Sequence, residues 1–181
     1  MSPIIIGLCG PSGSGKSKIT KELEALLDCK TFSADSYFKF NELPTMISPD
    51  DGNEYPDWNS PLSIDYDRLY NDIVDAVKQT EHRYIIVEGS LIYSVEKIRQ
   101  LCNIKLFVTA TKETCIYRRI VRNITLMGQT PEFIGGYYLK CARHREAEYC
   151  LPYVKCADMV IDNDVDYRKD MQKCIDFIKS Y

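Results

Sequence analysis

The stretch that decides the fold is Pro3-Ile4-Ile5-Ile6-Gly7-Leu8-Cys9 followed by Gly10-Pro11-Ser12-Gly13-Ser14-Gly15-Lys16-Ser17. The first part is a continuous apolar run, as in a strand that is buried on both faces of a parallel sheet. The second part matches G-x-x-x-x-G-K-[ST] at every fixed position and opens a segment with helical apolar spacing. A buried strand, a glycine-rich turn and a helix in this order predict a phosphate-binding loop.

Each part of this loop has a role in holding a nucleoside triphosphate. The glycines let the backbone curl so that several N–H groups point at one phosphate, and the helix that follows adds the positive end of its dipole. The Lys16 ammonium reaches the terminal phosphates, and the Ser17 hydroxyl is a ligand for Mg²⁺. We therefore expect the nucleotide to contact Gly10, Ser12, Gly13, Ser14, Gly15, Lys16 and Ser17.

Outward from the loop, apolar runs alternate with helical patterns along the chain. This alternation predicts an α/β fold, a three-layer sandwich with a mostly parallel five-stranded sheet, and the phosphate-loop motif indicates the P-loop NTPase type. Residues 36–60 have no apolar period and are expected to form a loop. We expect one domain over residues 1–181, with a helical lid at about 118–140. The further strands are predicted at 30–33, 84–88, 105–109 and 159–161, and the helices at 16–28, 62–79, 95–101, 111–126, 132–150 and 167–179.

The composition excludes several classes of protein. The formal net charge of the 181 residues is -3, which argues against a general nucleic-acid binder. No apolar run approaches the length of a membrane span, and the N-terminus lacks the basic start of a secretory signal. The eight cysteines form no C-x-x-C pair, so buried reduced thiols are expected. We expect a cytoplasmic protein that binds small molecules and neither nucleic acid nor membrane.

Two acidic residues follow predicted strands and are therefore expected at the ligand-binding edge of the sheet. Asp35 comes directly after the strand at 30–33, where it could accept the proton of an attacking hydroxyl or simply cap the next element. Glu88 ends the strand Ile85-Ile86-Val87 and could hold Mg²⁺ through water, together with Ser17 and Asp35.

Three arginines lie close together in the predicted helix at 111–126. Arg122 comes four positions after Arg118 and three after Arg119, which brings their guanidinium groups near one helix face. A forked donor suits phosphate oxygens, although a basic helix face can also be merely solvated. We favour a phosphate role for Arg119 or Arg122. Gly128-Gln129-Thr130-Pro131 and Gly135-Gly136 could be hinges of a closing lid or plain helix caps.

Beyond the phosphate loop, five stretches carry a likeness to a known group of enzymes. They are Ala34-Asp35-Ser36-Tyr37-Phe38-Lys39, Asp57-Trp58-Asn59-Ser60-Pro61-Leu62-Ser63-Ile64-Asp65, Val87-Glu88-Gly89, Arg118-Arg119-Ile120-Val121-Arg122 and Tyr153-Val154-Lys155-Cys156-Ala157-Asp158-Met159-Val160-Ile161. Together they resemble the P-loop kinases of the phosphoribulokinase and uridine kinase superfamily, which includes uridine–cytidine kinases and nicotinamide riboside kinases. The resemblance spans nearly the whole chain.

This resemblance implies transfer of the γ-phosphate of ATP to the 5′-hydroxyl of a riboside. It assigns Asp35 as the base and Glu88 as an acid that holds the metal through water, with Lys16 on the phosphates and Ser17 on Mg²⁺. It assigns Arg119 and Arg122 to substrate or ATP phosphates. The family's ribose-binding Asp falls at Asn59 or is replaced by Asp57, and Gln129 and Gly136 stand where uridine kinases have other residues.

The base that is accepted can be argued from the same stretches. The Asp57–Asp65 stretch, and the absence of a hairpin before the Glu88 strand, resemble fungal-type nicotinamide riboside kinases, whereas the second half resembles uridine kinases. A cationic pyridinium base would suit an aromatic and acidic pocket, and we lean toward nicotinamide riboside. Tyr37, Phe38, Glu54, Tyr55, Asp57, Trp58 and Asn59 are the candidates for that pocket.

Three alternatives stay open at this point: a uridine or cytidine kinase, an NTPase that needs no riboside, and a nucleotide-binding relative without catalysis. The residues at Asn59, Gln129 and Gly136 keep the last of these open. The choice of ATP over GTP and the oligomeric state are not fixed by the sequence.

Overall fold

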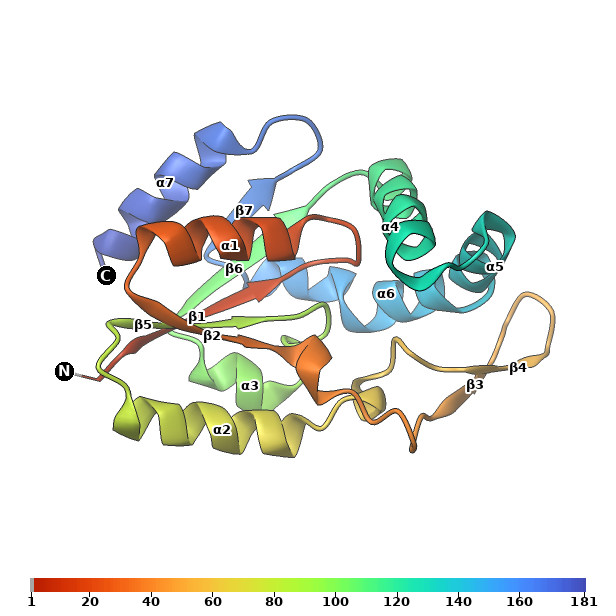
Figure 1. The fold of residues 1–181 in the computed structure, drawn as a ribbon, viewed down its shortest axis with the longest axis horizontal. Helices are drawn as coiled ribbons and strands as arrows, with labels where there is room; N and C mark the ends of the chain where they lie inside the picture. The colour runs from red at the N-terminus through yellow and green to blue at the C-terminus, as the bar shows by residue number, and fades with distance from the viewer. Residues whose placement is uncertain (1) are drawn as a thin grey trace.

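The centre of the molecule is a five-stranded parallel sheet in the order β2-β5-β1-β6-β7, seen edge-on among the helices in Figure 1. The structure is a computed structural model, and it describes residues 2–181. It confirms the predicted α/β fold with a parallel sheet. The strands are β1 (Ile4–Cys9), β2 (Cys29–Ser33), β5 (Tyr84–Glu88), β6 (Ile104–Thr109) and β7 (Met159–Asp162).

Helices cover both faces of this sheet, as the sequence pattern predicts. One face packs against α1 (Lys16–Leu26) and α7 (Arg168–Lys179), and the other against α2 (Tyr66–Gln79) and α3 (Glu96–Leu101). Ile5 and Ile6 are consecutive in β1, and their side chains enter opposite cores. Because both faces of the strand are buried, it reads as a continuous apolar run rather than an alternating one.

A continuous helical run beside the sheet confirms the helix predicted at 132–150 and contains a π-helical segment. It follows α4 (Lys112–Met127), which ends at Gly128 with a left-handed φ of 62°. Thr130 then caps the new run by accepting a hydrogen bond from the Phe133 N–H. The run consists of α5 (Pro131–Tyr137), a π-helical segment (Tyr138–Ala142) and α6 (Arg143–Tyr149), with no break between them.

The segment 36–60 is expected from the sequence to be a loop, but the structure shows regular elements within it. It contains an antiparallel hairpin of β3 (Thr45–Ile47) and β4 (Glu54–Pro56), with Met46 as the buried side chain of the first strand. Strands of three residues are too short to show a period in the sequence. A 3-10 turn at Pro61–Ser63 also delays α2, which begins after its Asp65 cap instead of at residue 62.

Most of the cysteine thiols are buried, in line with the expectation of reduced thiols. All eight cysteines are free, and Cys9, Cys102 and Cys174 lie within the two cores. Burial raises the pKa of Cys102 and of Cys174 to about 12, which keeps both thiols protonated. Across residues 2–181, none of the helices has the length and apolar character needed to cross a membrane.

Candidate active site

The loop between β1 and α1 has a backbone that only glycine tolerates. Gly13 has a φ of 89° and Gly15 a φ of 99°, both in the left-handed region. A Cβ atom on Gly13 would lie 2.2 Å from the Cys115 carbonyl oxygen, and one on Gly15 would lie 2.0 Å from Asn163 Nδ2. Both glycines are therefore required by conformation and by space. Gly15 is a fixed glycine of the motif, whereas Gly13 occupies one of its variable positions.

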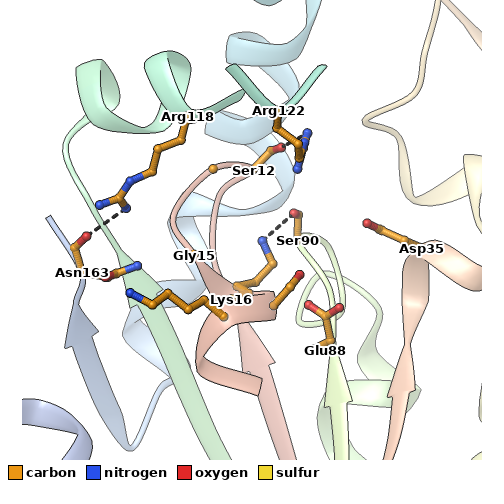
Figure 2. A pocket seen from close by; sticks show the side chains of 12 residues that line it. Ser12, Gly15, Lys16, Asp35, Glu88, Ser90, Arg118, Arg122 and Asn163 are labelled. Atoms are coloured by element: carbon orange, nitrogen blue, oxygen red, sulfur yellow. Dashed lines mark hydrogen bonds between the residues drawn. The ribbon is translucent and has the colours of Figure 1, made fainter. Parts of the chain in front are cut away.

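Lys16 lies at the start of α1, and its ammonium folds back over the loop. Its Nζ atom donates hydrogen bonds to the carbonyl oxygens of Gly10 at 2.8 Å and Pro11 at 3.1 Å, and to Ser90 Oγ at 3.0 Å. The side chain is buried, and all three acceptors are neutral. A phosphate oxygen would be a charged acceptor at the same place and would bind this ammonium more strongly. Figure 2 shows the contact with Ser90.

The register of the sheet brings two carboxylates to the mouth of the loop. Ser33 of β2 pairs with Glu88 of β5, and the Ser33 hydroxyl donates a 2.8 Å hydrogen bond to Glu88 Oε1. Burial raises the pKa of Glu88, although the nearby Lys16 ammonium opposes that shift. Asp35 follows in a 3-10 turn, is exposed and points into the same cavity.

Asp35, Glu88 and the Ser17 hydroxyl line one cavity of about 370 Å³ together with the phosphate loop. Carboxylate and hydroxyl oxygens are the ligands that Mg²⁺ prefers, and the ion usually completes its shell with water and substrate phosphates. The donor set therefore fits an ion that arrives with a nucleotide. Within the described chain, no three His, Cys, Asp or Glu side chains form a separate metal-binding group.

The three arginines of α4 have separate environments. Arg118 donates to the carbonyl oxygens of Asn163 at 2.9 Å and Asp164 at 3.3 Å, so it holds the loop after β7. Asn163 in turn donates from Nδ2 to the Ser14 carbonyl oxygen at 2.6 Å. Arg118 thus holds the Asn163 turn against the phosphate loop, and its side chain also lines the phosphate-loop cavity (Figure 2).

Arg122 lines the same cavity as Arg118, and Arg119 lines a neighbouring one. Arg122 donates to Ser12 Oγ at 3.4 Å, at the tip of the phosphate loop. Arg119 is largely buried, yet its Nε and Nη1 atoms have no hydrogen-bond partner among residues 2–181. Burial lowers the pKa of Arg119, and the Glu146 carboxylate opposes that shift. Buried guanidinium donors without an acceptor suit an anionic ligand.

A second and larger cavity, of about 690 Å³, adjoins the first. Three aromatic rings line one part of it: Phe38 lies 5.9 Å from Phe40 and 6.2 Å from Trp58 between ring centroids. In the part of the chain that the structure describes, Asp35 is the only carboxylate that lines this cavity. Its polar lining otherwise consists of Ser12, Ser17, Asn59, Ser90, Arg119, Arg122, Asn123, Gln129 and Tyr137.

The structure brings only part of the expected base pocket together. Trp58, Phe38 and Asn59 line the larger cavity, and Asn59 Oδ1 is buried without a partner in the described chain. The other candidates have partners elsewhere and are not among the lining residues. Tyr37 donates to Asp72 at 2.8 Å, Tyr55 donates to Asp51 at 2.7 Å, Glu54 accepts from Thr45 at 2.6 Å, and Asp57 pairs with Arg145 at 2.7 Å.

Asp57 is not among the residues that line this cavity. Its carboxylate is buried in an ion pair with Arg145 of α6, and burial raises its pKa in spite of that partner. The cage of aromatic and acidic side chains expected for a pyridinium base does not form. The residue that does face the cavity is the neutral Asn59.

Several residues that line the two cavities are not predicted from the sequence. Ser90 follows Glu88-Gly89 directly, so its place beside Lys16 could have been expected from the strand end. Asn123 could have been noticed one position after Arg122, whereas Tyr137 and Asn163 come from distant segments that no local pattern links to the loop. Their positions depend on tertiary packing.

Comparisons with known proteins agree with this geometry. Residues 75–167 match the model of the phosphoribulokinase/uridine kinase family. A uridine kinase of Clostridium perfringens is 32% identical, with 88% of this chain and 86% of the relative covered. A uridine kinase of Brevibacillus brevis is 27% identical, with 88% and 85% covered.

Solved structures support the fold alone, because their sequences are much less similar. TT1252 from Thermus thermophilus matches with a TM-score of 0.56 at 17% identity, covering 99% of this chain and 98% of that one. An uncharacterized protein from Eubacterium ventriosum matches with a TM-score of 0.58 at 18% identity, covering 98% and 99%.

Proposed function

We propose that this chain, which belongs to the phosphoribulokinase/uridine kinase family, phosphorylates the 5′-hydroxyl of uridine or cytidine with ATP as donor. Membership of the family makes it a phosphotransferase that acts on an alcohol group. One observation carries the proposal. Asp35 lines both the phosphate-loop cavity and the larger aromatic cavity, so its carboxylate lies where the two meet. A triphosphate on one side and a riboside on the other would both reach it.

The reaction follows from that placement. The oxygen of the 5′-hydroxyl bonds to the γ-phosphorus of ATP while the bond from that phosphorus to the β–γ bridging oxygen breaks. Asp35 accepts the hydroxyl proton, and the negative charge that leaves with ADP is met by Lys16 and the arginines. Mg²⁺ bound with ATP would neutralise part of the phosphate charge, and Ser17, Asp35 and Glu88 would hold it.

The lining of the larger cavity supports a neutral base over a cationic one. Two cations, Arg119 and Arg122, line it, and Asp35 is occupied at the reacting end. A pyridinium ring would meet like charge without a carboxylate to offset it. Asn59, Asn123 and Gln129 instead offer amide donors and acceptors, which suit the carbonyl and ring nitrogen atoms of a pyrimidine. The name carried by the related bacterial kinases points the same way, so a pyrimidine nucleoside replaces nicotinamide riboside as our proposed substrate.

We assign the segment 118–140 a lid role within a single domain. It includes the end of α4, all of α5 and the start of the π-helical segment, and it carries Arg119 and Arg122 over the loop. Closing it would exclude water and complete the phosphate contacts.

The direct test measures ADP release with ATP and Mg²⁺ in the presence of uridine, cytidine, adenosine or nicotinamide riboside. We expect release that depends on uridine or cytidine, with a 5′-monophosphate as product. Activity with nicotinamide riboside alone would reject the proposed base. Release without any riboside would indicate a hydrolase, and no release with the whole panel would reject nucleoside phosphorylation. The Asp35→Asn protein is the matched control for contaminating kinases.

A further inference from the structure

Tyr137, at the C-terminal end of α5, joins the lid to the wall of the larger cavity. Its hydroxyl donates a 3.0 Å hydrogen bond to the Pro56 carbonyl oxygen and accepts a 3.1 Å hydrogen bond from the Trp58 N–H. The same oxygen thus holds the backbone on both sides of Asp57. Burial raises the pKa of Tyr137, so the phenol keeps its proton and makes both bonds at neutral pH.

The held segment is the one that presents the riboside wall. Trp58 and Asn59 lie two and three residues after Pro56, and both line the cavity, as does Tyr137 itself. The Asp57 carboxylate is paired with Arg145 of α6 at 2.7 Å, which anchors the same segment a second time to the same helical run. The position of this wall is therefore fixed from the lid side of the molecule.

The ring of Tyr137 lies beside Arg119, which lines the same cavity. The Arg119 guanidinium carbon lies 5.9 Å from the centre of this ring, within reach of a cation–π interaction. Such a contact holds the guanidinium without using its N–H donors, and the Nε and Nη1 atoms of Arg119 have no partner in residues 2–181. Arg119 is thus positioned with its donors still available to a phosphate oxygen.

We infer that Tyr137 is a positioning residue that couples riboside binding to the placement of Arg119, its hydroxyl fixing the Trp58–Asn59 wall and its ring fixing the guanidinium. The reaction named in this inference rests on the proposed function, but the contacts do not. A riboside seated against the wall stiffens the Pro56–Trp58 backbone, and through one side chain it also stiffens the arginine on the phosphate side. The enzyme then has its charge-stabilising group in place when the acceptor is present.

The two halves of Tyr137 can be separated by substitution. Tyr137→Phe keeps the ring beside Arg119 and removes the two hydrogen bonds, so we expect KM for the nucleoside to rise about 3–10-fold while kcat stays within about 2-fold. Tyr137→Leu removes the ring as well, and kcat should then fall by a further factor of about 10. The control is Tyr138→Phe, a neighbour whose hydroxyl makes no bond to Pro56 or Trp58. It should match the wild type in both constants.

A second readout needs no substrate. Trp58 is the only tryptophan in the chain, so acrylamide quenching of its fluorescence reports on this wall alone. We expect stronger quenching in Tyr137→Phe than in the wild type or Tyr138→Phe, with melting temperatures of the three proteins within a few degrees.

The outcomes are distinguishable from those of the function test. Unchanged quenching and unchanged KM in Tyr137→Phe would overturn the inference, as would a large fall in melting temperature accompanied by equal losses in KM and kcat. If no nucleoside supports ADP release by the wild type, the proposed function fails, and the quenching comparison still accepts or rejects the role of Tyr137.

Discussion

Ser33 donates a 2.8 Å hydrogen bond to Glu88, which is also its register partner across β2 and β5. This bond ties the ends of two neighbouring parallel strands together at the edge of the sheet. Asp35 lies two residues beyond Ser33, so the bond also sets the distance of its carboxylate from the phosphate loop. The candidate base and the candidate metal acid are placed by the same pair of strands.

Removing the charge of Asp35 tests the proposed base. Asp35→Asn should lower kcat by about 10²-fold or more, because an amide cannot accept the hydroxyl proton. The affinity for a non-hydrolysable ATP analogue, measured by calorimetry, should stay nearly unchanged, since Lys16 and the loop remain. Turnover close to that of the wild type would remove Asp35 from the mechanism.

Lys16→Ala tests the phosphate contact. The ammonium now binds only neutral oxygens, of Gly10, Pro11 and Ser90, so its loss should weaken ATP binding and turnover together. Titration with ATP and steady-state assays measure both effects. Ser90→Ala is the control, because it removes one neutral acceptor and leaves the cation; it should bind ATP far better than Lys16→Ala. A normal ATP titration for Lys16→Ala would contradict the assignment.

Adjacent arginines should respond differently to the same substitution. Arg119→Lys removes a forked donor that faces the cavity, and kcat should fall about 10–100-fold with little change in melting temperature. Arg118→Lys breaks the paired contacts to the Asn163 and Asp164 carbonyl oxygens, so it should lower the melting temperature. The Arg118 guanidinium also lines the phosphate-loop cavity but is already bonded to these two oxygens, so kcat should fall less than in Arg119→Lys. Equal effects of the two variants on kcat would show that the environments of Arg118 and Arg119 do not separate their roles.

Trp58 gives a direct signal for riboside binding. Its side chain is 38% exposed and lines the larger cavity, so a base stacked beside it should change the wavelength or intensity of its emission. Titration with the nucleoside that supports turnover measures the effect, and a saturable change is expected. A silent titration with that nucleoside would place the base elsewhere.

The contacts of Asp50 lead us to expect that the free energy of unfolding depends on pH. Its carboxylate accepts from His144 and pairs with Arg143 at 2.8 Å, and these contacts hold its pKa below the usual value for aspartate. A lowered folded-state pKa stabilises the fold above the unfolded-state pKa, and this stabilisation is lost as the pH falls through the folded-state value.

The matched proteins for that test are Asp50→Asn and Glu42→Gln. In urea unfolding at pH 7, Asp50→Asn should be less stable than the wild type, and the difference should shrink as the pH falls below the unfolded-state pKa and vanish below the folded-state pKa of Asp50. Glu42 is exposed and takes part in no ion pair of residues 2–181, so Glu42→Gln should match the wild type throughout. A difference for Asp50→Asn that persists at low pH would reject the electrostatic explanation.

The sequence predicts the sheet and the phosphate loop well because both are encoded locally. An apolar run such as Ile4–Cys9 must be buried on both faces. The loop glycines are required by the backbone conformation of a few neighbouring residues. The base pocket is different, because the direction of a side chain in an irregular segment depends on its distant partners. Asp57 forms an ion pair with Arg145, and the Tyr55 hydroxyl forms hydrogen bonds with Asp51 and Lys140. Neither set of contacts can be predicted from the local sequence pattern.

The uninterrupted helical run from α5 through the π-helical segment to α6 has a consequence for engineering the enzyme. Two residues of this run hold the backbone segment that carries Trp58: Tyr137 bonds to the Trp58 N–H, and Arg145 pairs with the neighbouring Asp57. Base selectivity and catalytic rate therefore share one piece of scaffold. Libraries that randomise residues 131–149 to accept an altered base should recover variants whose turnover shifts along with their preference, and independent tuning will need changes at Phe38 or Phe40 instead.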